Sequence, residues 1–226
     1  QALKDISRAI TSDLFLEDLL KLIVMVTAKV MEVEICSLWI VDEEETPSKI
    51  RLKATQAISP DYVKDRSLDL NEGVVGEVIT NKQPLVIKNV VQCERFKEKE
   101  MAKKLGLESM LGVPLQLKNE EVIGALNCFT SEPHEFTQTE IDLLTTVANQ
   151  AAVAILNTEL MVKKKVIQEE LETRKLVGRA KEVLMQAQDM NGDEAHRWIQ
   201  KRSMDTRKSM REVAEAILLS EELYNN

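Results

Sequence analysis

Residues 110–130 read MLGVPLQLKNEEVIGALNCFT, and this stretch decides the fold. It contains two apolar runs, Met110–Leu117 and Val122–Thr130, on either side of the polar segment Lys118–Glu121. Connections of two to five residues between two such runs are typical of β-hairpins. The stretch therefore predicts two neighbouring antiparallel strands.

The residues before this hairpin alternate between strand and helix patterns. Strands are expected over Ile35–Val41, Ile50–Ala57 and Leu85–Ile87, and helices over residues 1–31, 74–80 and 95–105. In the first helix, an apolar stripe at helical spacing begins at Leu16 and includes Val26 and Val30. Thr27 is the one polar residue on that face, and Thr11–Asp13 are expected to interrupt the helix and cap the part that follows.

A long helix is expected after the hairpin. Thr137-x-x-Glu140 has the pattern of a capping box, and no strong helix breaker follows until Asn191-Gly192. The helix is predicted over about 137–187, and two shorter helices over Asp193–Ser203 and Arg207–Ser220. The fold class is therefore α+β: an antiparallel sheet flanked by helices, a long connecting helix, and a terminal unit of three helices.

Composition and charge divide the chain into two parts. A length of 226 residues allows one large domain or two smaller ones. The net charge is −8, of which residues 1–160 carry −9 and residues 161–226 carry +1. Residues 197–211 contain six Lys/Arg residues and one acidic residue, Asp205. An acidic body with a basic patch near its end predicts two modules with different partners.

The remaining composition excludes several protein classes. No apolar run is long enough to span a bilayer, and no signal peptide follows Gln1. The three cysteines, Cys36, Cys93 and Cys128, are odd in number and widely separated, which indicates a reducing compartment. The protein is therefore expected in the cytoplasm, without membrane partners.

The first 160 residues resemble a GAF domain. The resemblance lies in Gly73-Val74-Val75-Gly76-Glu77, in Val122-Ile123-Gly124-Ala125-Leu126, and in Phe136-Thr137-x-x-Glu140 before a long helix. It implies a pocket for a small molecule on the face of the sheet opposite the packed helices. For such a pocket Trp39, Asn127 and Phe129 are the expected lining residues. The ligand and any cofactor stay unassigned, because GAF domains bind many compounds or none.

Specific ligands and reactions of GAF domains find little support. The motif of cyclic-nucleotide GAF domains matches in two of five residues, and the Cys-His dipeptide of bilin attachment is absent. GAF enzymes that reduce methionine sulfoxide use three closely grouped cysteines, whereas the gaps here are 57 and 35 residues. No metal-ligand spacing and no catalytic constellation is found, so the protein is expected not to be an enzyme.

The C-terminal part resembles an ANTAR domain, the RNA-binding module of bacterial antiterminators. The hallmark Ala-Lys-x-x-Leu-Met is residues 180–185, the Glu-Ala of the second helix is residues 194–195, and Ser203-Met204 ends that helix. The family usually has Leu-Arg where this chain has Ile199-Gln200. Helical spacing predicts that Trp198 packs in the core and that His196 lies on the surface.

The resemblance implies a function in transcription antitermination. Residues 1–160 would form a GAF sensor and residues 161–226 an ANTAR domain that binds paired RNA stem-loops. The candidate RNA-binding residues are Arg174, Ala180, Lys181, Arg197, Gln200, Lys201, Arg202, Arg207 and Lys208. The alternative is a GAF-domain small-molecule sensor or redox protein that acts through protein–protein contacts of its C-terminal helices.

A homodimer is expected, because paired hairpins call for two RNA-binding units. The connecting helix is the natural place for the contact, although Ile155, Val162, Val166 and Glu169 do not hold a regular a/d heptad.

Overall fold

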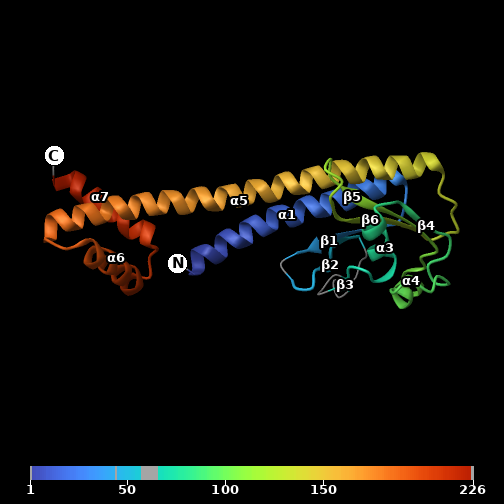
Figure 1. Ribbon diagram of the computed structural model, residues 1–226, viewed down its shortest axis with the longest axis horizontal. Helices are drawn as coiled ribbons and strands as arrows, with labels where there is room; N and C mark the ends of the chain where they lie inside the picture. The colour runs from blue at the N-terminus through green and yellow to red at the C-terminus, as the bar shows by residue number, and fades with distance from the viewer. Residues whose placement is uncertain (1, 44, 57–65, 225–226) are drawn as a thin grey trace. The chain divides into compact units, whose positions relative to one another are not determined.

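The computed structural model describes residues 2–43, 45–56 and 66–224. It divides into two compact units (Figure 1). One unit is Leu14–Thr158, and the other contains residues 1–13 and 159–226. The architecture is α+β, as the sequence predicts. In the described ranges, no helix combines the length and the apolar character that crossing a membrane requires.

A six-stranded antiparallel sheet forms the first unit, in the order β3-β2-β1-β6-β5-β4. Its strands are β1 (Ile35–Asp42), β2 (Lys49–Thr55), β3 (Ser67–Asp69), β4 (Leu85–Ile87), β5 (Ser109–Gln116) and β6 (Val122–Thr130). The predicted hairpin is β5–β6, which pairs along its whole length. The sequence did not predict β3. Ala57, placed in the second strand by the sequence, lies outside the described residues.

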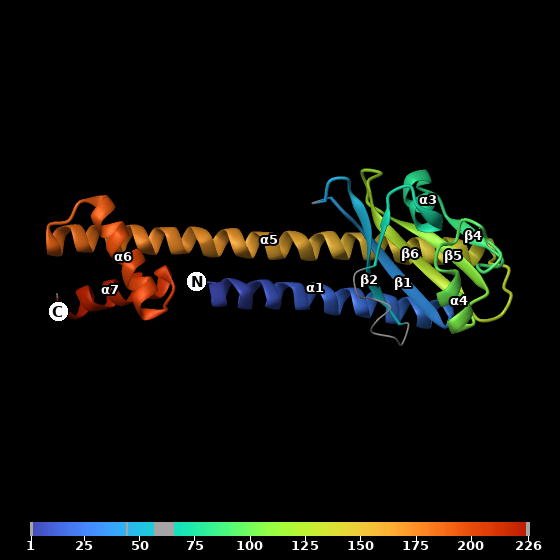
Figure 2. The ribbon, with the colours of Figure 1, turned by 90° about the horizontal axis from the view of Figure 1, so that it is seen from below.

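The two faces of the sheet carry separate hydrophobic clusters. On one face, Cys36, Leu38 and Leu126 pack with residues of α1 (Ala2–Met31) and α5 (Gln138–Gln188). On the other face, Trp39 and Phe129 pack with residues of α3 (Gly73–Asn81) and α4 (Lys99–Leu105). Figure 2 shows α1 and the first part of α5 on one side of the strands and α3 on the other. Since alternate residues of a strand point to opposite faces, one strand serves both clusters.

Helix α1 differs from its prediction in two ways. It is continuous from Ala2 to Met31, so Thr11–Asp13 do not interrupt it. Its core face also lies further round the helix than expected: Val24 is buried, whereas Val26 and Val30 are about half exposed. Thr27 is buried, as its place on the predicted face requires. The buried Thr27 hydroxyl donates to the carbonyl oxygen of Ile23 at 2.7 Å, which satisfies it within the helix.

The helix predicted over residues 95–105 is shorter than expected. It begins only at Lys99, and Arg95–Glu98 form a connecting segment. The C-terminal end is as predicted, because Gly106 takes the left-handed conformation (φ 66°) and caps the last turn.

The C-terminal unit has one small core. The second half of α5 packs with α6 (Gly192–Thr206) and α7 (Met210–Tyr224). The fully or almost fully buried residues of this core are Val177, Ala180, Leu184, Ala195, Ile199, Val213, Ala214 and Leu218. The terminal unit of three helices that the sequence predicts is therefore confirmed.

Candidate nucleic-acid interface and ligand pocket

Hydrogen bonds within the chain fix both ends of α6. The Asn191 side chain accepts from the backbone N–H groups of Asp193 and Glu194, both at 3.0 Å. The Glu194 carboxylate in turn accepts from the Asn191 N–H at 2.8 Å, which completes a capping box. At the other end, the Ser203 hydroxyl donates to the carbonyl oxygen of Lys208 at 2.6 Å. The orientation of the α6 side chains is therefore set by local interactions.

The outer face of α6 carries three of the predicted RNA-binding residues. Ala195, Ile199 and Ser203 are buried and recur every fourth residue along the helix. With 100° of rotation per residue, Arg197 and Lys201 lie on the opposite side and Gln200 on the flank beside them, and all three are exposed. Met204 shares this face with 67% of its surface exposed. The sequence reasoning missed Met204, although its spacing of three from Lys201 already places it on that side.

Two more cations lie on one flank of α5. Arg174 and Lys181 are two turns apart, so they share a side of the helix; Arg174 is exposed and Lys181 half-buried. Lys181 lies beside the first turn of α6, where its Nζ would be 3.8 Å from a Cβ at Gly192. The neighbouring Ala180 has no exposed surface and belongs to the core. Its place among the RNA-binding residues is therefore wrong: a small side chain is needed there for the helices to approach.

The turn between α6 and α7 presents the remaining cations. Arg207 adopts the left-handed conformation (φ 55°), and its N–H bonds to the Met204 carbonyl oxygen at 3.3 Å. Arg207 and Lys208 are both exposed, as is Arg202 in the last turn of α6. Ser209 and Glu212 then cap the start of α7 reciprocally, with 2.8 Å from Ser209 N to Glu212 Oε2.

These cations form no ion pair with any acidic residue that the structure describes. Among the residues that the structure describes, Arg174, Lys181, Arg197, Lys201, Arg202, Arg207 and Lys208 have no acidic partner within 4 Å. Arg211, by contrast, pairs with Glu215 at 2.7 Å and Glu172 at 3.7 Å. Glu215 is the main cause of the raised pKa of Arg211. The exposed cations are therefore available to the phosphates of a partner, and Arg211 serves the packing of α7.

The sequence interpretation of the two other residues of α6 agrees with the structure. Trp198 is half-buried and packs against the small core, and His196 is exposed. Trp198 therefore has only part of its surface available to a nucleic-acid base.

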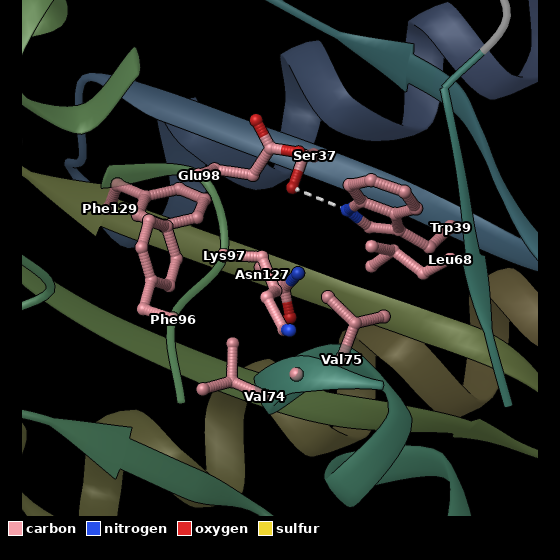
Figure 3. Close-up of a pocket in the computed structure, with 11 residues that line it drawn as sticks. Ser37, Trp39, Leu68, Val74, Val75, Phe96, Lys97, Glu98, Asn127 and Phe129 are labelled. Atoms are coloured by element: carbon pink, nitrogen blue, oxygen red, sulfur yellow. Dashed lines mark hydrogen bonds between the residues drawn. The ribbon is translucent and has the colours of Figure 1, made fainter. Parts of the chain in front are cut away.

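A narrow pocket lies on the sheet face covered by α3 (Figure 3). Its cavity has a volume of about 20 Å³, which is room for about one water molecule and far below the roughly 300–1,000 Å³ of ligand pockets, so a larger ligand would have to displace the walls. Trp39, Asn127 and Phe129, the three residues expected from the sequence, all line it. The other lining residues are Ser37, Leu68, Gly73, Val74, Val75, Phe96, Lys97 and Glu98.

The floor of the pocket is a polar row across three strands. Asn127 is paired in register with Ser37 on one side and with Gly112 on the other. The Trp39 Nε1–H donates to the Ser37 hydroxyl at 3.2 Å, the bond drawn in Figure 3. Asn127 is 1% exposed, and its Oδ1 has no hydrogen-bond partner among the described residues. A Cβ at Gly112 would lie 2.7 Å from this oxygen, so only glycine leaves room for it.

The charged residues at the rim are neutralised in pairs. Lys97 contacts Glu72 at 3.3 Å, and Glu98 pairs with Arg66. The Asp69 N–H, followed by Lys97, lowers the pKa of Glu72. The pocket therefore has apolar and aromatic walls, a few uncharged polar groups and no unpaired charge among its described lining residues, which suits an uncharged ligand better than a phosphate.

Comparison with known families decides the identity of both units. The profile of the GAF domain matches residues 13–156, and that of the ANTAR domain matches residues 165–218. The chain belongs to the GAF domain family and carries an ANTAR domain. The match assigns the pocket to the GAF domain and the unpaired cations to the ANTAR domain.

Individual relatives agree with this division. Transcriptional regulatory protein PdtaR of Mycobacterium tuberculosis, in two strains, is 48% identical over 52 residues, which are 23% of this chain and 25% of that protein. The chain thus matches only about a quarter of the length of these curated relatives.

Solved structures resemble the GAF domain. The GAF domain of a phosphoenolpyruvate-protein phosphotransferase from Acinetobacter is 28% identical, with a TM-score of 0.55. The corresponding domain from Coxiella burnetii is 25% identical, with a TM-score of 0.58. Each comparison covers 65% of this chain and 85% of the other.

The cysteines of the GAF domain do not converge as a group of three. Cys36 and Cys128 lie together on the helix-covered face, whereas Cys93 is half-buried and packs with the cluster on the pocket face. The described residues also contain no group of three His, Cys, Asp or Glu side chains that could hold a metal ion. The three-cysteine arrangement considered for a sulfoxide-reducing GAF enzyme is therefore not formed.

Proposed function

We propose that this protein is a bacterial signal-responsive regulator that binds paired RNA hairpins and promotes transcription antitermination. Residues 1–160 would be the GAF sensor and residues 161–226 the RNA-binding domain. The observation that carries the proposal is the group of exposed, unpaired cations on α5, α6 and the α6–α7 turn, within a matched ANTAR domain. The protein would act by binding rather than by catalysis.

The unpaired cations suit an RNA partner for an electrostatic reason. Lys and Arg side chains that contact phosphates release condensed counterions, and binding weakens steeply with salt. Lys201 and Arg197 would contact phosphates from the outer face of α6, and Arg207 and Lys208 from the turn. Gln200 lies on the flank of α6 beside Arg197 and Lys201 and would bond to a base edge, because an amide can donate and accept but carries no charge.

Recognition of two hairpins would use two copies of the chain. In the GAF unit, Phe15, Leu22 and Val26 of α1 expose 59%, 56% and 49% of their surfaces. With the half-buried Leu19 they recur at intervals of four, three and four residues, which is the spacing of a coiled-coil seam. We propose that a second copy covers this face. In light scattering, Leu22→Glu/Val26→Glu should give a monomer where the wild-type chain gives a dimer.

On α5, a second group of apolar side chains is exposed. Ile155 is buried in the GAF core, whereas Leu160, Ile167 and Leu171 are at least half exposed. They are separated by seven and four residues, so they lie on one side of the helix. They would extend the contact between copies along the connecting helix.

The test of RNA binding compares two RNAs at two salt concentrations. A leader RNA with paired hairpins should bind selectively over a scrambled RNA of equal length, and the affinity for both should fall with salt. Equal affinity for both RNAs would remove the hairpin specificity. No binding by a folded, dimeric protein would favour the alternative, a sensor or redox protein that acts through protein contacts of its C-terminal helices.

The GAF pocket would supply the signal. A ligand changes the output only if it binds two arrangements of the protein with different affinity. A small uncharged ligand should therefore alter RNA affinity in the wild-type chain, and Asn127→Leu should remove that response while leaving the basal RNA affinity unchanged. The measurement is RNA affinity across a panel of uncharged compounds, with a phosphate ester as the charged control.

A further inference from the structure

Two thiols that are 92 residues apart in the chain meet on neighbouring strands. Cys36 of β1 and Cys128 of β6 are paired in register, and their sulfur atoms lie 3.2 Å apart. Both side chains are fully buried on the sheet face covered by α1 and α5. Neither belongs to the ligand pocket or to the RNA-binding surface, so the function proposed above makes no use of them.

The backbone geometry of this pair suits a disulfide bond. The Cys36 N–H donates to Gln56 Oε1 at 2.7 Å, and its carbonyl oxygen accepts from Thr55 Oγ1 at 2.9 Å. Both bonds lie on the side of β2, so Cys36 faces Cys128 as a non-hydrogen-bonded pair. In such pairs the Cα atoms are about 4.5 Å apart and the side chains are close. A disulfide closes across Cα distances of roughly 4.4–6.8 Å.

The pair also lies near the ends of its strands. Cys36 is the second residue of β1, and Cys128 is the third from the end of β6. Strand ends open locally at much lower cost than the whole sheet. Local opening at these strand ends would let a small uncharged molecule reach the sulfur atoms without global unfolding.

A hydrogen-bond bridge connects Cys36 to α1. The Gln56 amide accepts from the Cys36 N–H and donates from Nε2 to the Val24 carbonyl oxygen at 2.9 Å. A shift of Cys36 would therefore move Gln56, whose side chain links α1 to the sheet.

We infer that Cys36 and Cys128 form a redox modification site, at which a peroxide converts the dithiol to an intramolecular disulfide. In the first step one sulfur attacks a peroxide oxygen, the O–O bond breaks, and a sulfenic acid and one molecule of water form. In the second step the other sulfur displaces the sulfenic hydroxyl group as water. Two S–H bonds and one O–O bond are lost, one S–S bond and two O–H bonds are gained, and hydrogen peroxide is reduced to two molecules of water.

The reaction at this site is slow. The hydrogen bond with Cys36, followed by burial, raises the pKa of Cys128, so this thiol is protonated at neutral pH. Thiolates are the reactive form of cysteine. The site therefore responds to sustained oxidation rather than to a brief pulse.

The experiment exposes the folded full-length chain to hydrogen peroxide, stops the reaction with catalase and counts free thiols after denaturation in an alkylating reagent. The three thiols should fall to one, and peptide mass mapping should show a Cys36–Cys128 link. Dithiothreitol should restore all three thiols. Cys93→Ser is the control; its count should fall from two to none.

Other outcomes overturn the inference. A folded protein that keeps three thiols under peroxide, or that uses Cys93 in its disulfide, contradicts the site. In the Cys36→Ser variant, the two remaining thiols, Cys93 and Cys128, should form no intramolecular disulfide under peroxide. If this variant does not fold, Cys128→Ala provides the same comparison, because alanine fills a buried position without a polar group.

Discussion

The two units of this chain differ in how many of their positive charges are paired with carboxylates. In the GAF unit, Arg51, Arg66, Lys88, Arg95, Lys97 and Lys103 each contact a carboxylate. In the C-terminal unit, Arg211 has such contacts, and the cations of α6 and the α6–α7 turn have none among the described residues. Charges that are paired within a fold stabilise that fold, whereas unpaired charges attract an external partner.

The two units also differ in their cores. The GAF sheet buries residues on both faces, in two clusters that include several large side chains. The C-terminal unit has a single cluster, in which Ala180, Ala195 and Ala214 contribute little apolar surface. A small core supplies little stability, so the unit with the free charges tolerates the least damage.

The largest expected effect comes from truncating the centre of the smaller core. Ile199 is fully buried among the three C-terminal helices. Ile199→Ala should cost about 2–5 kcal/mol, because buried contacts are lost and a cavity remains. Hydrogen exchange should show lost protection in α6 and α7 while the sheet stays protected. Equal loss of protection in both units would mean that they unfold as one.

The second prediction removes two unpaired charges. Lys201→Ala/Arg202→Ala should weaken RNA binding at least tenfold, and each lost phosphate contact should reduce the salt slope by about 0.7. The matched control is Lys103→Ala/Lys104→Ala, which removes the same charge from α4 of the GAF unit. If both variants lost RNA affinity equally, binding would depend on the net charge of the protein and not on the unpaired cations of the C-terminal unit.

The third prediction concerns the start of α6. Asn191→Ala deletes the side chain that accepts from two N–H groups, at a cost of about 1 kcal/mol. Chemical denaturation should show this loss in the transition of the C-terminal unit. Asn191→Ser keeps an acceptor and is the conservative control; if it loses as much as alanine, the cap does not explain the effect.

The smallest effect is expected at a paired surface charge. Lys103 lies 3.2 Å from Glu100, and both side chains are exposed. Lys103→Ala should change stability by only about 0–0.5 kcal/mol. A larger loss in the thermal unfolding of the GAF unit would show that its ion pairs do more than exposed pairs usually do.

Local patterns predicted most of the fold. The hairpin of residues 110–130 and the small C-terminal core follow from apolar periodicity and caps, which depend on neighbouring residues. The three-residue strand β3 was missed because such a short segment shows almost no alternation. The α1 face was misplaced because the helix has apolar residues on both sides, and only packing decides which side is buried.

The candidate sites were predicted less completely. Trp39, Asn127 and Phe129 line the pocket as expected, but Ser37 and Gly112 were missed. The same applies to the contact between Cys36 and Cys128. These neighbours come from the register of distant strands, which one sequence without its pairing partners does not reveal. Ala180 was misassigned because a motif does not separate a residue that packs from one that binds.

The reciprocal caps of α6 and α7 have a consequence for the kinetics and heat of binding. Because Asn191, Glu194, Ser209 and Glu212 close both helix starts within the chain, the spacing of the cations exists before RNA arrives. The entropy of ordering this surface is lost when the protein folds, not when it binds. Calorimetry should then give a heat-capacity change that reflects the contact area alone, without the larger value of coupled folding. Association should be as fast as electrostatic attraction allows, and the lifetime of the complex should decide which transcripts are selected.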